Sequence, residues 1–162
     1  MKTDRGVLLA EDDPNDVFLL ERAFEDAGIH NPLRAVCDGQ EAIEYLSGTG
    51  KFSDRNQFPF PALVILDLKM PRKTGIDVLH WLRKEDSFRC LPTVMLSSSA
   101  HPTDVEKAYR LGVNAFVVKP PGISQRAELA RMIKGFWLTL NELPLICTDG
   151  PDAARKVRLE EP

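Results

Sequence analysis

Polar side chains that suit the binding of a metal ion follow four short apolar runs of the sequence. Carboxylates are ligands for hard divalent cations, and an ammonium group can offset the repulsion between neighbouring carboxylates. If one fold brings these groups together, they form a single site. The four sets are Glu11-Asp12-Asp13, Asp67, Ser97-Ser98-Ser99 and Lys119-Pro120.

The acidic residues predict a site that needs positive charge. Two carboxylates about 4 Å apart repel by roughly 1 to 4 kcal/mol, depending on the local dielectric. Lys119 can offset part of this repulsion, and Mg²⁺, which prefers octahedral oxygen ligation, can offset the rest. We therefore interpret Asp12 and Asp67 as a functional pair. Asp13 stands directly before Pro14 and is interpreted as a helix N-cap.

Short apolar runs alternate with longer segments of helical periodicity along most of the chain. The run Ala62–Leu66 has no polar residue, which is typical of a strand buried on both faces of a parallel sheet. The sequence therefore predicts an α/β fold, a doubly wound five-stranded parallel sheet with helices on both faces. The predicted strands are residues 6–10, 33–37, 62–66, 92–96 and 115–118, and the predicted helices are 14–28, 39–47, 75–84, 103–111 and 124–141.

The carboxyl ends of these strands are the expected place for a ligand, because parallel strands end at one edge of the sheet. All four polar sets follow predicted strand ends, so we expect them to converge there. Dinucleotide and P-loop sites need a Gly-rich turn after the first strand, and this chain has acids in that position. The expected crevice therefore binds a cation first.

Three local patterns add detail to the predicted elements. Asp38 and Glu41 have the spacing of a capping box at the start of the second helix. Residues 48–61 contain two Gly and two Pro and are expected to form a loop that is long for an α/β connection. The last helix is expected to bury one apolar stripe in the core, made of Leu129, Ile133, Phe136, Trp137 and Leu140.

The composition excludes several classes of protein. The 162 residues include 43% hydrophobic ones, which supports a real core, and 21 Lys+Arg against 24 Asp+Glu give a net charge of −3 with no basic stripe for nucleic acid. Three distant cysteines without C-x-x-C spacing predict neither a zinc site nor a disulfide framework. No signal peptide or membrane-spanning run is apparent. We therefore expect a cytoplasmic, soluble domain that binds neither nucleic acid nor a membrane.

The order and spacing of these motifs resemble the receiver domain of two-component response regulators, with its flavodoxin-like fold. Each motif is weak alone, but together they are very specific and extend from about residue 7 to 141. The resemblance rests on the acidic Glu11-Asp12-Asp13, on Asp67-Leu68-Lys69-Met70-Pro71 with Gly75 after it, on Ser97, and on Lys119-Pro120.

This resemblance implies a role for each residue of the motif. Asp67 is the implied phosphoacceptor, and Lys119 the lysine that neutralises the phosphoryl oxygens. Ser97 is the implied switch hydroxyl and Phe116 the aromatic switch residue. The family usually holds the bond after the lysine in the cis form. The implied Mg²⁺ ligands are Asp12, Glu11 through water, Asp67 and the backbone carbonyl of Lys69.

A second, weaker resemblance concerns the partner. The loop at 48–61, and the last helix followed by Glu142-Leu143-Pro144-Leu145-Ile146, are similar to the small response regulators that partner phytochrome-type histidine kinases. Those regulators often self-associate. The resemblance thus implies a histidine kinase as phosphodonor and a homodimer formed through the C-terminal helix region.

Two alternatives stay open. An aspartyl-nucleophile phosphatase similar to the haloacid dehalogenase-like family would also use an acidic site, but such enzymes usually have a second Asp where Lys69 stands. A receiver-like interaction module that is never phosphorylated is the other alternative, and the complete set of acids, hydroxyl and lysine disfavours it. We expect a phosphoacceptor that acquires and loses its own phosphoryl group, not a turnover enzyme.

The domain organisation is predicted from length. One domain is expected over residues 1–146, with a polar tail over 147–162. Only 21 residues follow position 141, which is too few for a DNA-binding or catalytic output domain. The expected output is therefore a changed surface for protein contact.

Overall fold

A parallel sheet forms the centre of the fold in the computed structural model, which describes residues 6–144. Its five strands lie in the order β2-β1-β3-β4-β5. The strands are β1 (Gly6–Ala10), β2 (Leu33–Val36), β3 (Pro61–Asp67), β4 (Thr93–Ser97) and β5 (Ala115–Val118). The α-helices are α1 (Pro14–Asp26), α2 (Gly39–Ser47), α3 (Gly75–Lys84), α4 (Pro102–Arg110) and α5 (Ile123–Ile133). The predicted doubly wound α/β fold is confirmed, and β1, α2, α3 and β5 have the predicted bounds.

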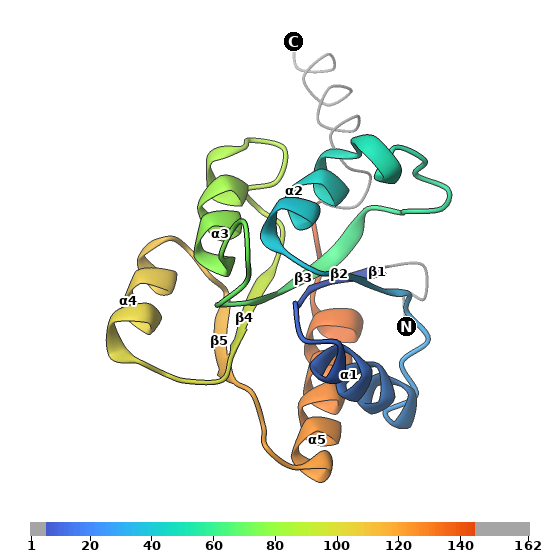
Figure 1. Cartoon of the computed structure of the whole chain (residues 1–162). Helices are drawn as coiled ribbons and strands as arrows, with labels where there is room; N and C mark the ends of the chain where they lie inside the picture. The colour runs from blue at the N-terminus through green and yellow to red at the C-terminus, as the bar shows by residue number, and fades with distance from the viewer. Residues whose placement is uncertain (1–5, 145–162) are drawn as a thin grey trace.

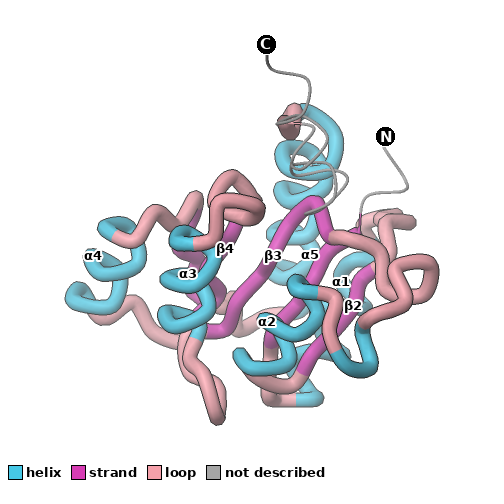
Figure 2. Tube along the Cα trace, turned by 90° about the horizontal axis from the view of Figure 1, so that it is seen from above, coloured by secondary structure: helices cyan, strands magenta, loops and turns pink. Residues whose placement is uncertain are grey.

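Helices cover both faces of the sheet, as Figure 1 shows, with α2 and α3 on the opposite side from α1 and α5. The view turned by 90° has α2 and α3 in front of the strands (Figure 2). Each face has its own hydrophobic core, one beneath α2, α3 and α4 and the other beneath α1 and α5. Among residues 6–144, no helix is long and apolar enough to cross a membrane.

The alternation of side chains along each strand decides which core a residue joins. On β3, Val64 and Leu66 belong to the core under α2 and α3, whereas Leu63 and Ile65 belong to the core under α1 and α5. Every pairing between neighbouring strands is parallel, and the register shifts only at the start of β1, so the same alternation holds at the carboxyl edge. The side of any residue at a strand end follows from this pattern.

Side-chain caps fix the helix starts beside the carboxyl edge of the sheet. The Asp38 carboxylate accepts a hydrogen bond from the Glu41 backbone N–H at 2.9 Å, as the capping-box spacing predicts. The reciprocal half of the box does not form, because the Glu41 carboxylate accepts from the backbone N–H of Cys37 at 3.1 Å and pairs with Lys51. The capping-box prediction at α2 was therefore half wrong, since Lys51 draws the Glu41 side chain toward the following loop.

The long connection between α2 and β3 is packed rather than open. It contains a short 3₁₀ helix (Gly50–Phe52) and an aromatic cluster in which the Phe52 ring lies 5.2 Å from both the Tyr45 and Phe58 rings. The Arg55 guanidinium donates hydrogen bonds to the Tyr45 and Leu46 carbonyls at 2.7 Å. Both carbonyls lie in the last turn of α2, where the regular hydrogen bonds of a helix end.

The end of the last helix departs from the prediction. The helix α5 is followed by η2 (Lys134–Leu140), a π-helix, so the spacing between residues on one face lengthens from about four to about five. Leu138 is consequently buried, five residues after the buried Ile133, whereas Phe136 and Leu140 are 53% and 73% exposed. The prediction that Phe136 and Leu140 join a buried stripe was wrong. The predicted tail over 147–162 lies outside the described residues.

Candidate functional site

Three charged residues lie at strand ends on the α1–α5 side of the carboxyl edge. Glu11, Asp67 and Lys119 follow Leu9, Ile65 and Val117 by two residues each, and those three belong to the core under α1 and α5. Backbone hydrogen bonds extend the ladder to the residues beyond the strands, from Glu11 N–H to Val36 and from Lys119 N–H to Ser97. The alternation along three strands of the sheet therefore points all three side chains the same way.

The acidic residues meet as the sequence predicts. Glu11, Asp12 and Asp67 each offer one carboxylate oxygen, and these oxygens lie within 4.8 Å of one another. Glu11 and Asp67 are buried, and Asp12 is exposed at the mouth of the cluster. Three carboxylates with an open side form a donor set suited to a hard divalent cation that keeps some of its water ligands.

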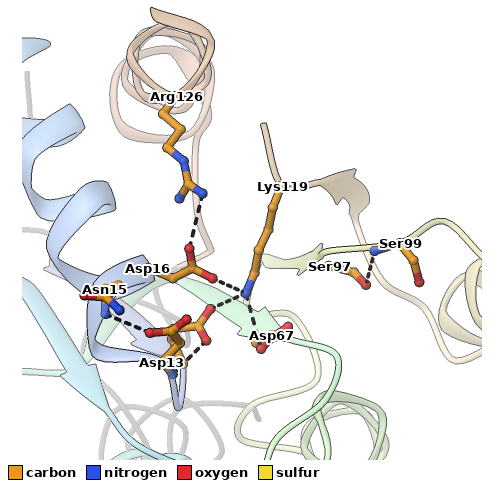
Figure 3. Close-up of polar contacts among 9 residues, drawn as sticks. Asp13, Asn15, Asp16, Asp67, Ser97, Ser99, Lys119 and Arg126 are labelled. Carbon is orange, nitrogen blue, oxygen red and sulfur yellow. Dashed lines mark hydrogen bonds and ion pairs between the residues drawn. The ribbon is translucent and has the colours of Figure 1, made fainter. Parts of the chain in front are cut away.

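The Lys119 ammonium lies among three carboxylates (Figure 3). Its Nζ atom is 2.6 Å from Glu11 Oε2, 2.8 Å from Asp16 Oδ2 and 3.4 Å from Asp67 Oδ2. The Lys119 side chain is only 10% exposed, so this charge is held in a medium that screens it less than bulk water does. Lys119 thus offsets part of the repulsion within the acidic cluster.

Burial and pairing shift the pKa values of these groups in opposite ways. Burial raises the pKa of Glu11 to about 7, although the hydrogen bonds from Lys119 and from the Asp13 N–H oppose that rise. Burial alone would lower the pKa of Lys119, but hydrogen bonds to Asp16 and Glu11 and the charge of Asp67 outweigh it and raise the pKa. Lys119 is therefore an ammonium at every physiological pH.

Asp16 and Arg126 belong to the same polar network, and the sequence predicted neither. Asp16 lies in the first turn of α1, and its second oxygen, Oδ1, is 3.2 Å from the Arg126 guanidinium of α5. Burial would raise the pKa of Asp16, but the hydrogen bonds and charges of Lys119 and Arg126 outweigh it, so the pKa is lowered. An acid in a helix's first turn is so common that its type and position gave no signal.

Asp13 has the structural role that the sequence predicts. Its carboxylate accepts a hydrogen bond from the Asn15 backbone N–H at 2.9 Å, and α1 begins at Pro14. The Asp13 backbone N–H in turn donates to Glu11 Oε1 at 3.1 Å. The start of α1 thus orients one carboxylate of the acidic cluster.

Ser97 and Phe116 lie on the other side of the sheet from the charged cluster. Ser97 follows Met95 by two residues, and Met95 and Phe116 both pack in the core under α2, α3 and α4. The Ser97 hydroxyl is buried and accepts a hydrogen bond from the Ser99 N–H at 3.2 Å (Figure 3). Phe116 is partly buried against that core.

The loop after β3 begins directly beside Asp67. Lys69 has an exposed side chain, and the chain turns back at Gly75, whose N–H donates to the Leu68 carbonyl at 3.0 Å.

None of the described peptide bonds is cis, so the Lys119–Pro120 bond is trans and departs from the usual form in the family. With this bond trans, Lys119 still points toward the carboxylates, where its short ion pairs hold it.

Known proteins resemble this chain in sequence. The family model for the response regulator receiver domain matches residues 7–134. Response regulator Rcp1 of Synechocystis is 30% identical over 138 residues, which are 85% of this chain and 92% of that protein. The probable methanogenesis regulatory protein FilR2 of Methanothrix harundinacea is also 30% identical over 138 residues, 85% of this chain and 86% of its own.

Solved structures agree with these sequence relatives. The phosphorylated cyanobacterial phytochrome response regulator RcpA has a TM-score of 0.80 at 30% identity, covering 87% of this chain and 99% of its own. The response regulator RPA3017 in red light signaling of R. palustris has a TM-score of 0.81 at 38% identity, covering 86% and 98%. Given the matched residues, the shared fold and the acidic site at the carboxyl edge, the chain belongs to the response regulator receiver domain family.

Proposed function

We propose that this response regulator receiver accepts a phosphoryl group on Asp67 from a histidine kinase and signals through a changed protein-contact surface. The observation that carries the proposal is the meeting of the Lys119 ammonium, 3.4 Å from Asp67 Oδ2, with the cluster of Glu11, Asp12 and Asp67. A nucleophilic carboxylate, a cationic donor and an open acidic cluster are the parts that phosphoryl transfer to an aspartate requires.

Phosphoryl transfer at this site is mainly a matter of positioning and charge. An Asp67 carboxylate oxygen attacks the phosphorus, the bond from phosphorus to the donor's histidine nitrogen breaks, and that nitrogen keeps the electron pair. Lys119 donates to the phosphoryl oxygens and stabilises the charge that develops on them. Glu11, Asp12, Asp67 and the Lys69 carbonyl would hold Mg²⁺, which when bound supplies further positive charge beside those oxygens.

We propose Ser97 and Phe116 as the residues that report phosphorylation to the face under α2, α3 and α4. The buried Ser97 hydroxyl has a hydrogen to donate to a new phosphoryl oxygen, and moving it toward Asp67 would leave space beside Met95 and Phe116. Phe116 is only partly buried against that core, so an inward turn of its ring would bury more apolar surface. The changed surface would then involve α4, β5 and α5.

The phosphodonor that we propose is a phytochrome-type histidine kinase. The structures similar to this chain include the bacteriophytochrome response regulators RtBRR, at 38% identity, and AtBRR, at 41% identity.

We propose the cytoplasm as the compartment, and the two described cysteines, Cys37 and Cys90, support it because both are exposed free thiols. The chain would acquire and lose its own phosphoryl group, without the turnover of a phosphatase.

Acetyl phosphate with Mg²⁺ tests the phosphoacceptor. Intact-mass spectrometry should detect one added phosphoryl group per chain, labile to base, and Asp67→Asn should abolish it. Asp54→Asn is a matched control, because Asp54 is an exposed loop acid, and it should label like the native chain. Continued labelling of Asp67→Asn, or no labelling of the native chain, contradicts the proposal. Rapid multiple turnover on phosphate esters would instead favour the phosphatase.

We also propose a homodimer formed through the C-terminal helix region. Met132, Phe136 and Leu140 are more than half exposed on α5 and η2, which would leave an apolar surface facing water in a monomer. Sedimentation of the native chain should give a dimer, and truncation after Asn141 together with Phe136→Ser should give a monomer. A monomeric native chain, with and without phosphorylation, contradicts this proposal.

A further inference from the structure

We propose that Asp16 is a positioning residue that holds Lys119 back from Asp67, and that Arg126 sets how strongly it does so. The inference rests on the proposed function, since it concerns the rate at which Asp67 is phosphorylated. It adds α1 and α5 to the elements that control the site.

The first observation is the position of the Lys119 ammonium among its acceptors. Nζ is 2.8 Å from Asp16 and 2.6 Å from Glu11, but 3.4 Å from Asp67. An ammonium has three hydrogens to donate, and two of them are taken by short hydrogen bonds to acceptors other than the proposed phosphoacceptor. Of these three contacts of Lys119, the one with Asp67, the proposed phosphoacceptor, is therefore the longest and the weakest.

The second observation is that Asp16 is separate from the acidic cluster. Glu11 and Asp67 are at strand ends and share the cluster with Asp12, whereas Asp16 lies on α1 and is not part of that cluster. A cation held in the cluster would offset the charge of Glu11 and Asp67 directly, and would leave Asp16 as the competing anion for Lys119. The competition by Asp16 thus persists when the site is ready for phosphoryl transfer.

The third observation is that Asp16 is itself shared between two cations. Lys119 contacts Oδ2 and the Arg126 guanidinium contacts Oδ1 at 3.2 Å, as the close-up in Figure 3 shows. The side chains of Asp16 and Arg126 are 21% and 15% exposed, so both pairs are partly shielded from solvent. Arg126 draws Asp16 toward α5 and so weakens its hold on Lys119.

These contacts make the two substitutions act in opposite directions. Loss of the Asp16 charge frees Lys119 to donate to the phosphoryl oxygens, so phosphorylation becomes faster. Loss of the Arg126 charge removes the cation that competes with Lys119 for Asp16. Asp16 then holds Lys119 more strongly, so phosphorylation becomes slower. A purely structural role for this network would slow the reaction in both variants.

The test measures phosphorylation of the full chain by acetyl phosphate at saturating Mg²⁺. In Asp16→Asn the rate should rise about threefold to tenfold, the change expected when a partly buried ion pair stops competing. In Arg126→Gln it should fall by about threefold on the same scale. The double variant should behave like Asp16→Asn, because Arg126 acts through Asp16. Asp16→Glu keeps the negative charge, so its phosphorylation rate should stay within about twofold of the native value.

Matched controls separate this effect from a general change in charge. Glu25→Gln removes one negative charge from exposed α1, and Arg22→Gln removes one positive charge from the same surface; neither should change the rate by more than about twofold. Slower phosphorylation of Asp16→Asn, faster phosphorylation of Arg126→Gln, or an equal rise in Glu25→Gln overturns the inference. If the native chain labels on Asp67 while these results appear, the proposed function stands and only the role of Asp16 is wrong.

Discussion

Gly75 approaches Asp67 so closely that a β-carbon at position 75 would lie 2.3 Å from the Asp67 carbonyl oxygen and 2.9 Å from the Met95 sulfur. The clash with a backbone oxygen cannot be relieved by rotating a side chain. The start of α3 is therefore seated directly on the residue that we propose as the phosphoacceptor.

Gly75→Ala should displace the end of β3. We expect it to lower the free energy of unfolding by about 1 to 3 kcal/mol, as overpacking in a core does, and to slow phosphorylation of Asp67. Urea denaturation and acetyl phosphate labelling measure the two effects. Gly135→Ala is the control, because a β-carbon at Gly135 meets no atom within 4 Å beyond its chain neighbours and the backbone of its own helix. Equal stability of the two variants would mean that α3 moves away without cost.

Asp12→Asn should weaken binding of Mg²⁺. The amide removes one of the three charges of the acidic cluster while keeping the shape of the side chain, so we expect affinity to fall about tenfold or more. Isothermal titration calorimetry with Mg²⁺ and with Mn²⁺ measures it. Asp13→Asn, which retains the α1 cap, should keep affinity within a few-fold of the native value. An unchanged affinity in Asp12→Asn would remove Asp12 from the proposed ligands.

Asp38 should make the stability of the fold sensitive to acid. Burial would raise the pKa of Asp38, but hydrogen bonds from the Glu41 N–H and from Arg72 outweigh it and lower the pKa. The stabilisation is therefore fully present above the pKa of an unfolded Asp, about 3.9, and is lost as pH falls through the lower folded value. Asp38→Asn keeps a capping side chain, so its stability deficit should be largest near neutral pH and should shrink in acid.

Thermal unfolding of the native chain and of Asp38→Asn across the acid range checks this dependence. The Arg72 guanidinium is 2.7 Å from Asp38 Oδ2, and Arg72 itself has a φ of 60°, a left-handed conformation that is rare for a side chain of this kind. The ion pair therefore holds Arg72 against a backbone preference. In an Arg72→Gln background, the effect of Asp38→Asn on stability should depend less on pH. A deficit that grows in acid would contradict the expected sign.

Leu138 and Leu140 should respond differently to the same substitution. Leu138 is 1% exposed in the core under α1 and α5, so Leu138→Ala should cost about 2 to 5 kcal/mol of unfolding free energy. Leu140 is 73% exposed, so Leu140→Ala should change stability by about 0.5 kcal/mol or less. Urea denaturation of both variants compares them. The reverse order would mean that an ordinary α-helix continues through residues 134–140.

The sequence was informative wherever a residue's place follows from a strand. Apolar runs in the sequence located β1, β3 and β5. The rule that parallel strands end at one edge predicted that Glu11, Asp12 and Asp67 come together, and their carboxylate oxygens, which lie within 4.8 Å of one another, confirm it. The direction of Lys119 could also have been derived, because alternation along β5 puts it on the side of Val117. Regular strand geometry turns sequence position into spatial position.

The parts that the sequence did not reveal depend on contacts between helices. Asp16 and Arg126 are 110 residues apart and meet because α1 and α5 pack on one face, and neither residue type indicates that contact. The π-helix at η2 was missed for a related reason. Periodicity counts residues at fixed spacing, and the extra residue in a π-turn shifts every later position onto another face. Periodicity alone therefore predicts neither the contact between α1 and α5 nor the face on which Leu138 and Leu140 lie.

The short strand β5 directs the side chains of Phe116 and Lys119 to different layers of helices. Phe116 faces the helices α2, α3 and α4, whereas Lys119, three residues later, faces α1 and α5, where it meets the network of Asp16 and Arg126. The odd separation along the strand sends the two side chains to opposite layers. Inserting or deleting a single residue between positions 116 and 119 would put the aromatic ring and the ammonium on the same side of the sheet, so either the proposed switch residue or the proposed site lysine would face the wrong layer although both were still encoded.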